Sequence, residues 1–311
     1  MAALLAAPLA AAAAVPALAQ DSVPDRLRTL SRGLTWTPVS VVTLQFPTHH
    51  PQGMVRIGDR FYISSVEILE RTQRHDPPRD GMDRSAGRGR GHLFEVDAEG
   101  RLLRDLVLGE GDSYHPGGLD YDGRHLWVPA AEYRPNSRSI IYRVDPTNMR
   151  AEEVFRFGDH IGGLVMDRAS NTLHGVSWGS RRFYAWPVGP DGKPANAEVR
   201  PEALRRANPS HYIDYQDCHS AGAGLALCSG LNAYRPQGPN GPVFALGGVE
   251  LVDLARGAPV FQLPVELWTE SGLPMTQNPF FVVPQGDRGL RFWFAPEDER
   301  TRIYAYDVQP R

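Results

Sequence analysis

Lysine is nearly absent from this sequence, and positive charge does not exceed negative charge. Lys193 is the single lysine among 311 residues, and the formal net charge is −3 at pH 7. Proteins that bind nucleic acids usually carry a basic face, which this composition does not favour. Lys193 lies in the turn-like sequence PDGKP. The sequence therefore argues against Schiff-base or pyridoxal chemistry, which needs a sequestered amine.

Long apolar runs are also rare, and one occurs at the N-terminus. The sequence MAALLAAPLAAAAAVPALAQ ends in Ala17-Leu18-Ala19, a pattern typical of a signal-peptide cleavage site. We expect residues 1–19 to be a cleaved signal peptide, with an uncleaved membrane anchor as the alternative. This predicts a periplasmic or secreted protein that does not remain attached to a membrane.

Cysteine occurs twice, at Cys218 and Cys228, on either side of HSAGAGLAL. The Gly222-Ala223-Gly224 centre of this segment predicts a tight turn between two strands. Both cysteines are equally far from that turn, so they would face each other across an antiparallel pair, within disulfide range. In an oxidising compartment we expect a disulfide, and two buried free thiols are the alternative.

One sequence pattern occurs twice: His-Pro-x-Gly, two short apolar runs and then a glutamate. The copies are HHPQGMVRIGDRFYISSVEI (49–68) and YHPGGLDYDGRHLWVPAAEY (114–133). His50 then corresponds to His115, and Glu67 to Glu132. A third stretch, DHIGGLVMDRASNTLHGVSWG (159–179), repeats the opening with His160.

A second unit, an alternating strand that usually ends near Asp, recurs five times: HLFEVD (92–97), IIYRVD (140–145), RFYAWP (182–187), GVELVD (248–253) and RIYAYD (302–307). Two apolar runs precede each copy, and another usually follows. Four-stranded units repeated around an axis form a β-propeller. We predict an all-β, five-bladed propeller over residues 34–311, with a two-sheet β-sandwich as the alternative.

The two ends of the chain are expected to close the ring. The fifth unit stops without its fourth strand, whereas TWTPVSVVTLQFP (35–47) is a strand without a unit of its own. We therefore predict that residues 35–46 pair with 302–308. The segment 20–33 is expected to hold one short helix, packed outside the ring, because Ser22 and Pro24 are typical of a helix start.

Propeller geometry then predicts where chemistry takes place. The first strand of each blade lines the channel, and its start lies at the same face as the end of the second strand. His50 with Glu67 and His115 with Glu132 are thus expected at one channel mouth. The equivalent positions are His160 and Trp178 in blade 3, Asp214, Gln216, Asp217 and Asn232 in blade 4, and Gln277, Asn278 and either Glu297 or Asp298 in blade 5.

These residues predict a polar site with more than one possible chemistry. His50, His115 and His160 are candidate ligands of one divalent metal ion, with zinc suited to imidazoles and calcium or magnesium to carboxylates. Without metal, His115, Glu132 and Glu67 are candidate catalytic acid–base groups. The remaining residues of the mouth are candidate ligand-binding groups. The alternative is that each histidine only bonds to the backbone of a neighbouring blade.

Two insertions between second and third strands are expected near the same mouth, at residues 68–91 and 232–242. The first carries six arginines and four acidic residues. It is either a solvated loop or a mobile arm that contacts an anionic or polyhydroxylated ligand.

The sequences HPQG, HPGG, HIGG and YQDCHS resemble those of a family of secreted bacterial and fungal proteins of unknown function, over roughly residues 34–311. More distantly, the chain is similar to gluconolactonase and strictosidine-synthase propellers. That resemblance implies a metal or a catalytic acid at the channel mouth, although those proteins usually have six blades and carboxylate and Asn ligands.

Two classes of function follow. The preferred one is a hydrolase, lactonase-like or esterase-like, or a lyase, that acts on a small polar molecule in the funnel. The alternative is a non-catalytic propeller that binds a ligand or partner. We expect a monomer that binds no nucleic acid.

Overall fold

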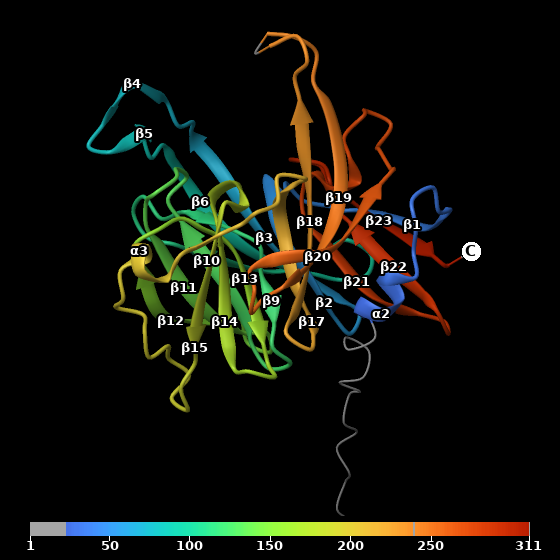
Figure 1. Cartoon of the computed structure of the whole chain (residues 1–311), viewed down its shortest axis with the longest axis horizontal. Coiled ribbons are helices and arrows are strands. Elements are labelled where there is room, and N and C mark those ends of the chain that lie inside the picture. Colours follow the sequence, from blue (N-terminus) through green and yellow to red (C-terminus); the bar gives the residue numbers. More distant parts are fainter. Residues whose placement is uncertain (1–22, 239, 311) are drawn as a thin grey trace, which may run out of the picture.

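The computed structural model describes residues 23–238 and 240–310, so the predicted signal peptide lies outside the described residues. The fold is a five-bladed β-propeller, as predicted (Figure 1). Blade 1 consists of β2 (His50–Ile57), β3 (Arg60–Glu70), β6 (Arg88–Val96) and β7 (Leu102–Leu108). Blade 2 consists of β8 (His115–Pro116), β9 (Asp120–Tyr121), β10 (Leu126–Ala131), β11 (Ser139–Asp145) and β12 (Arg150–Phe157).

The other three blades follow the same antiparallel order. Blade 3 consists of β13 (Ile161–Asp167), β14 (Thr172–Ser177), β15 (Arg182–Pro187) and the two-residue β16 (Arg206–Ala207). Blade 4 consists of β17 (Asp214–Gly222), β18 (Leu225–Tyr234), β19 (Phe244–Asp253) and β20 (Ala258–Val265). Blade 5 consists of β21 (Phe280–Gln285), β22 (Gly289–Phe294), β23 (Arg302–Val308) and β1 (Trp36–Thr43).

Strand β1 closes the ring. It pairs antiparallel with β23, from Trp36 opposite Val308 to Thr43 opposite Arg302. The predicted pairing of residues 35–46 with 302–308 is therefore confirmed. Helix α2 (Val23–Arg28) packs outside the ring, with Val23 and Leu27 buried in the apolar cluster of blades 4 and 5.

The apolar core lies between neighbouring blades rather than along the axis. One cluster joins blades 1, 2 and 5, a second joins blades 4 and 5, and two smaller ones join blades 2 and 3 and blades 3 and 4. The inner strands are crowded where the motif glycines lie. A Cβ on Gly117 would lie 2.2 Å from the Gly162 carbonyl oxygen, and one on Gly118 would lie 2.7 Å from Asp217 Oδ1. These positions need glycine because a neighbouring backbone at Gly117, and the buried Asp217 carboxylate at Gly118, leave no room for a Cβ.

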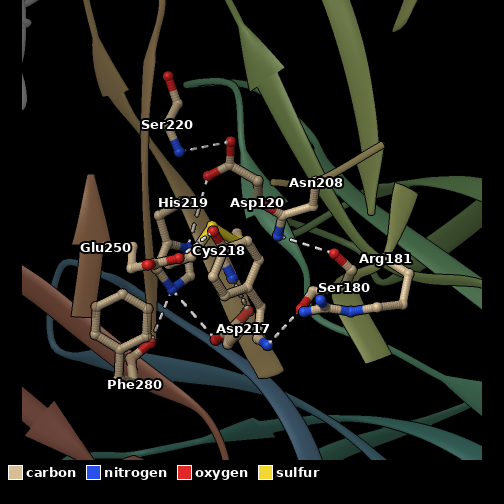
Figure 2. Close-up of a disulfide and its surroundings, with 12 residues drawn as sticks. Asp120, Ser180, Arg181, Asn208, Asp217, Cys218, His219, Ser220, Glu250 and Phe280 are labelled. Atoms are coloured by element: carbon tan, nitrogen blue, oxygen red, sulfur yellow. Dashed lines mark hydrogen bonds and ion pairs between the residues drawn. A yellow bond between two sulfur atoms is a disulfide. The ribbon is translucent and has the colours of Figure 1, made fainter. Parts of the chain in front are cut away.

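A buried polar network joins all five blades near the axis, and Figure 2 shows its central residues, Asp120, Asp217 and His219. Asp217 of blade 4 accepts a hydrogen bond from the Met54 amide of blade 1 at 3.0 Å. Asp120 of blade 2 accepts one from the Met166 amide of blade 3 at 2.8 Å. His219 lies between the two carboxylates, 3.2 Å from Asp217 and 3.7 Å from Asp120. We call Asp120, Asp217 and His219 the axial network.

The charge of the axial network follows from these contacts. His219 Nε2 also donates to the Phe280 carbonyl oxygen of blade 5 at 2.8 Å. Burial alone would lower the pKa of His219, but Asp217 and Asp120 outweigh it and raise this pKa to about 10. His219 is therefore an imidazolium at neutral pH, and it stabilises the two carboxylates that bond the other blades.

The predicted disulfide is present. Cys218 and Cys228 are register partners on β17 and β18, and their sulfurs are bonded with the Cα atoms 4.0 Å apart. None of the described helices is long and apolar enough to cross a membrane.

Candidate functional site

In blades 1 and 2, the start of the first strand lies beside the end of the second strand, as predicted. His50 on β2 is the register partner of Val66 on β3, next to Glu67. His115 on β8 is the partner of Ala131 on β10, next to Glu132. We call this end of the ring the mouth.

Three histidines from three blades form a row at the mouth. The ring centroid of His115 lies 6.3 Å from that of His50 and 6.1 Å from that of His160. His115 is 4% exposed, stacks on Tyr133 at 4.3 Å, and has no hydrogen-bond partner at either ring nitrogen. Burial, with His160 and His50 nearby, holds the pKa of His115 well below its usual value. His115 is therefore neutral at neutral pH.

His160 is held by the blade next to it. Its Nδ1 donates to the backbone carbonyl oxygen of Glu132 at 2.7 Å, which leaves the lone pair on Nε2. Its ring meets the Trp178 ring edge-on, with centroids 4.8 Å apart. Burial lowers the pKa of His160 to about 4. This backbone bond is the structural role that the sequence left open for any one of the histidines.

The Glu132 carboxylate does not bond to His115. It is 1% exposed and accepts hydrogen bonds from Arg134 Nε at 2.6 Å and from Arg138 Nε at 2.8 Å. Two guanidinium groups thus neutralise it, and it fixes the loop between β10 and β11. The acid–base pair predicted for His115 and Glu132 is not hydrogen-bonded in this structure.

A hydrogen-bonded His–Asp pair occurs instead between blades 1 and 5. His50 Nδ1 lies 2.8 Å from Asp298 Oδ1, and its Nε2 lies 2.8 Å from the Gln52 amide nitrogen. Since Gln52 donates to Nε2, His50 must donate from Nδ1 to Asp298. Asn278 Nδ2 donates to the same oxygen at 2.9 Å. Burial opposes ionisation of Asp298, but the hydrogen bonds from His50 and Asn278 prevail and lower its pKa.

This His–Asp pair lies in the wall of a cavity of about 590 Å³ at the mouth. We call it the mouth pocket, and its polar lining includes His49, His50, Glu67, Arg71, Tyr133 and Asp298. The volume is in the range of small-molecule sites. Of the two positions that the sequence left open in blade 5, Asp298 therefore lines the pocket. Glu297 bonds instead to Arg302 and Tyr304.

Both insertions project at the mouth end of the ring, as expected (Figure 1). The first forms the hairpin of β4 (Arg74–Arg79) and β5 (Met82–Arg84). Its Arg84 guanidinium lies 5.0 Å over the Trp178 ring, so an arm from blade 1 reaches blade 3. The second insertion extends β18 and β19, whose last register pair is Tyr234 with Phe244.

The remaining predicted residues are spread over blades 4 and 5. Asp214 is exposed at the rim and pairs with Arg181 at 3.1 Å, and Asn232 donates to the His211 carbonyl at 3.1 Å. Gln216 and Gln277 are partly buried. Asp217, in contrast, belongs to the buried axial network, 1% exposed. The structure thus places His50 and Glu67 at the mouth pocket, and Asn278 bonds to Asp298 of the same pocket. The blade 4 residues do not line this pocket.

Blade 3 contains a G-x-S-x-G sequence, Gly175–Gly179, with the spacing of a hydrolase nucleophile elbow. Its context differs, because Ser177 ends strand β14, is 4% exposed and accepts a hydrogen bond from the Arg182 amide at 3.0 Å. No histidine in the described part of the chain forms a hydrogen bond with the Ser177 hydroxyl. Ser177 therefore has a structural role in the turn that follows it.

One cluster of possible metal ligands was missed by the sequence reasoning. His49, Glu67 and His92 each offer a ligand atom, and these atoms lie within 4.8 Å of one another. Within the described part of the chain, these three residues form the one group of His, Cys, Asp or Glu side chains that meets this distance. The group includes none of His50, His115 and His160. The available signals were the doubled histidine before Pro51 and the histidine that opens HLFEVD.

Two of the known structures that match the chain are similar to it at a low level. Hydrazine synthase of Kuenenia stuttgartiensis is 14% identical with a TM-score of 0.39, over 81% of this chain and 57% of that chain. The tail fibre of Staphylococcus aureus phage P68 is 8% identical with a TM-score of 0.45, over 89% of this chain and 53% of that chain. The chain thus spans little more than half the length of each, and neither likeness carries an argument about function.

Among curated proteins, none matches this chain. The more distant similarity to gluconolactonase and strictosidine-synthase propellers therefore stays a prediction. A match over residues 7–310, nearly the whole chain, shows that this protein belongs to a family of unknown function (DUF6454).

Proposed function

We propose that this propeller is a hydrolase or lyase that acts on a small polar substrate in the mouth pocket. The observation that carries the proposal is the hydrogen bond between His50 Nδ1 and Asp298 Oδ1, at 2.8 Å, in the wall of that pocket. A carboxylate on one ring nitrogen fixes the tautomer and leaves the other nitrogen as a base. In this proposal, His50 and Asp298 take the acid–base role that the sequence predicted for His115 and Glu132.

The pocket offers the other groups that such a reaction needs. Once the substrate displaces the Gln52 amide, His50 Nε2 accepts a proton from water, and the hydroxide adds to the carbonyl carbon of an ester or lactone. The tetrahedral intermediate then breaks its bond to the alkoxide oxygen, which takes the proton back from His50. Asp298 stabilises the imidazolium that forms. Arg71 lines the same pocket and suits a developing oxyanion or an anionic substituent. Glu67, a predicted catalytic residue, lines it as well and would orient the substrate or the water.

The test is a panel of small esters and lactones with purified protein. His50→Gln and Asp298→Asn should each lower kcat/KM by about 10²- to 10⁴-fold, the usual contribution of a positioned base. His125→Gln is the matched control, because His125 is also near an aspartate, Asp122, at 3.9 Å. It lies at the opposite end of β10 from Glu132. Equal, background-level rates for all four proteins would refute the proposal.

A second candidate is a binding propeller without catalysis. The separate contacts of His115 and Glu132 favour it. His115 stacks on Tyr133, whereas two arginines neutralise the Glu132 carboxylate, so the two residues do not form the predicted acid–base pair. If the panel gives background rates, binding of the same esters and lactones, measured by calorimetry and weakened in His50→Gln, would support this candidate.

A further inference from the structure

We propose that His49, Glu67 and His92 bind one Zn²⁺ ion at the edge of the mouth pocket. The site differs from the predicted set of His50, His115 and His160. It rests on the proposed function only in sharing the pocket, since His49 and Glu67 both line it. Metal binding itself is measurable whether or not the protein is an enzyme.

The sheet of blade 1 brings two of the ligands together. His92 on β6 is the register partner of Ser65 on β3, two residues before Glu67. Glu67 and His92 are therefore diagonal neighbours on one face of the sheet. His49 comes from the segment that enters β2, and its ring centroid lies 5.3 Å from that of His92. Its backbone φ of 55° is in the left-handed region, which is uncommon for a residue other than glycine.

His92 is oriented in the way that a metal ligand usually is. Its Nδ1 lies 2.9 and 3.1 Å from the two carboxylate oxygens of Asp105, to which it donates. Metal-binding histidines commonly donate their other ring nitrogen to a carboxylate. The Nε2 atom of His92 is buried without a hydrogen-bond partner, in a residue that is 5% exposed.

The unpartnered nitrogen faces a negative group. Glu67 Oε2 lies 3.8 Å from His92 Nε2, too far for a hydrogen bond. With Nδ1 donating to Asp105, a neutral His92 presents a lone pair to this carboxylate, so two acceptors face each other. A cation between them removes the conflict.

The ligand types favour zinc. Two imidazoles and one carboxylate form the donor set of many catalytic zinc sites, whereas calcium and magnesium prefer oxygen ligands alone. Tetrahedral zinc with bonds of about 2.0–2.1 Å needs its ligand atoms about 3.3 Å apart. The separations here, 3.8 Å and at most 4.8 Å, exceed this by an amount that side-chain rotation can remove. Because His49 and Glu67 line the pocket, water or substrate would reach the ion from that side as a further ligand.

The surrounding charges are compatible with a bound cation. Arg90 Nη1 lies 3.4 Å from Glu67 Oε2, but its side chain is 54% exposed and free to turn towards solvent. Glu299 Oε2 lies 4.0 Å from His49 Nδ1, on the side where a carboxylate would orient that ring. Asp105 supplies a further negative charge behind His92.

The experiment is a calorimetric titration of chelator-treated, full-length protein with zinc chloride. Metal content is also measured after dialysis. Wild type should bind one Zn²⁺ per chain and show a higher melting temperature with zinc than without. His92→Gln and Glu67→Gln should weaken binding at least 100-fold. Asp105→Asn should weaken it about 10- to 100-fold, as expected for a residue that orients a ligand. Melting curves without zinc check that each variant folds, and Glu67, the more exposed residue, covers the case in which His92→Gln does not.

His115→Gln and His125→Gln are the matched controls and should retain zinc binding. Loss of binding in His115→Gln with retention in His92→Gln would overturn the proposal in favour of the predicted histidine row. Absence of one-to-one binding in wild type would also overturn it. Since these measurements do not use a substrate, hydrolysis that depends on His50 in a protein without zinc would leave the proposed function standing.

Discussion

The axial network makes a specific prediction about stability at alkaline pH. The pKa of His219 is raised from 6.5 to about 10 by Asp217 and Asp120. A raised pKa means that the folded state binds the proton more tightly than the unfolded state. The stabilisation is therefore complete below pH 6.5, decreases as the pH rises, and is lost above about pH 10.

The magnitude follows from the shift. One pKa unit corresponds to about 1.4 kcal/mol, so the free energy of unfolding should fall by about 2–3 kcal/mol between pH 7 and pH 9. Other groups contribute little in this interval. His160 and His174, whose pKa values are lowered, change the free energy of unfolding only below about pH 6.5. Tyr114, with a pKa raised to about 12, acts only near and above pH 10.

The assay is urea denaturation at pH 7, 8 and 9 and constant ionic strength, followed by tryptophan fluorescence without reductant. His219→Gln should be less stable at pH 7 and should show a flat profile, because its side chain does not titrate. If that variant does not fold, Asp120→Asn should fold with a smaller decrease than wild type. A flat wild-type profile, or the same decrease in His219→Gln, would refute the reasoning.

Three further predictions concern single features. Replacing Cys218 and Cys228 by serine should lower the free energy of unfolding by about 3 kcal/mol, as expected for a closed loop of 10 residues, and an unchanged denaturation midpoint would contradict this. Gly117→Ala should cost about 3 kcal/mol because its Cβ would meet the Gly162 carbonyl, whereas Gly163→Ala, with its nearest atom at 3.8 Å, should be tolerated; equal melting temperatures would argue against close backbone contact as the cause. Arg84→Ala should speed proteolysis within residues 71–88 through loss of the contact with Trp178, without a change in melting temperature; unchanged cleavage would show that this contact does not hold the arm.

The fold was predictable because its signals are local and repeated. Each third strand alternates over about six residues, and each HPxG motif marks an inner strand that needs glycine. The unpaired segment at 35–47 and the missing last strand together fixed the blade count. The broken inner strand of blade 2, β8 and β9, was not predictable, because it depends on the close contacts of Gly117 and Gly118 with other blades.

The site was predictable only in its location. The repeat places His50, His115 and Glu132 at one mouth, but side-chain partners depend on residues outside the repeat. Arg134 and Arg138 bond to Glu132, and no spacing rule indicates this.

Two other outcomes had the same cause. Asp298 was one of two candidates for the blade 5 position, and the hydrogen bond from His50 distinguishes it. His49 and His92 were missed because neither has a counterpart in the other blades, so a search for repetition passes over them.

The closure of the ring by β1 and β23 has a consequence for the order of folding during synthesis. A ribosome makes Trp36–Thr43 early, but the partner strand Arg302–Val308 is among the last segments to emerge. Until then β1 has no sheet to join, and the first and last blades have no closed ring between them. Blades 1 to 4 can form as the chain grows, whereas the final closure must wait for the C-terminal strand. A chain stalled before residue 302 is therefore expected to expose an unpaired strand at each end of an open ring, and to be the species most prone to aggregation.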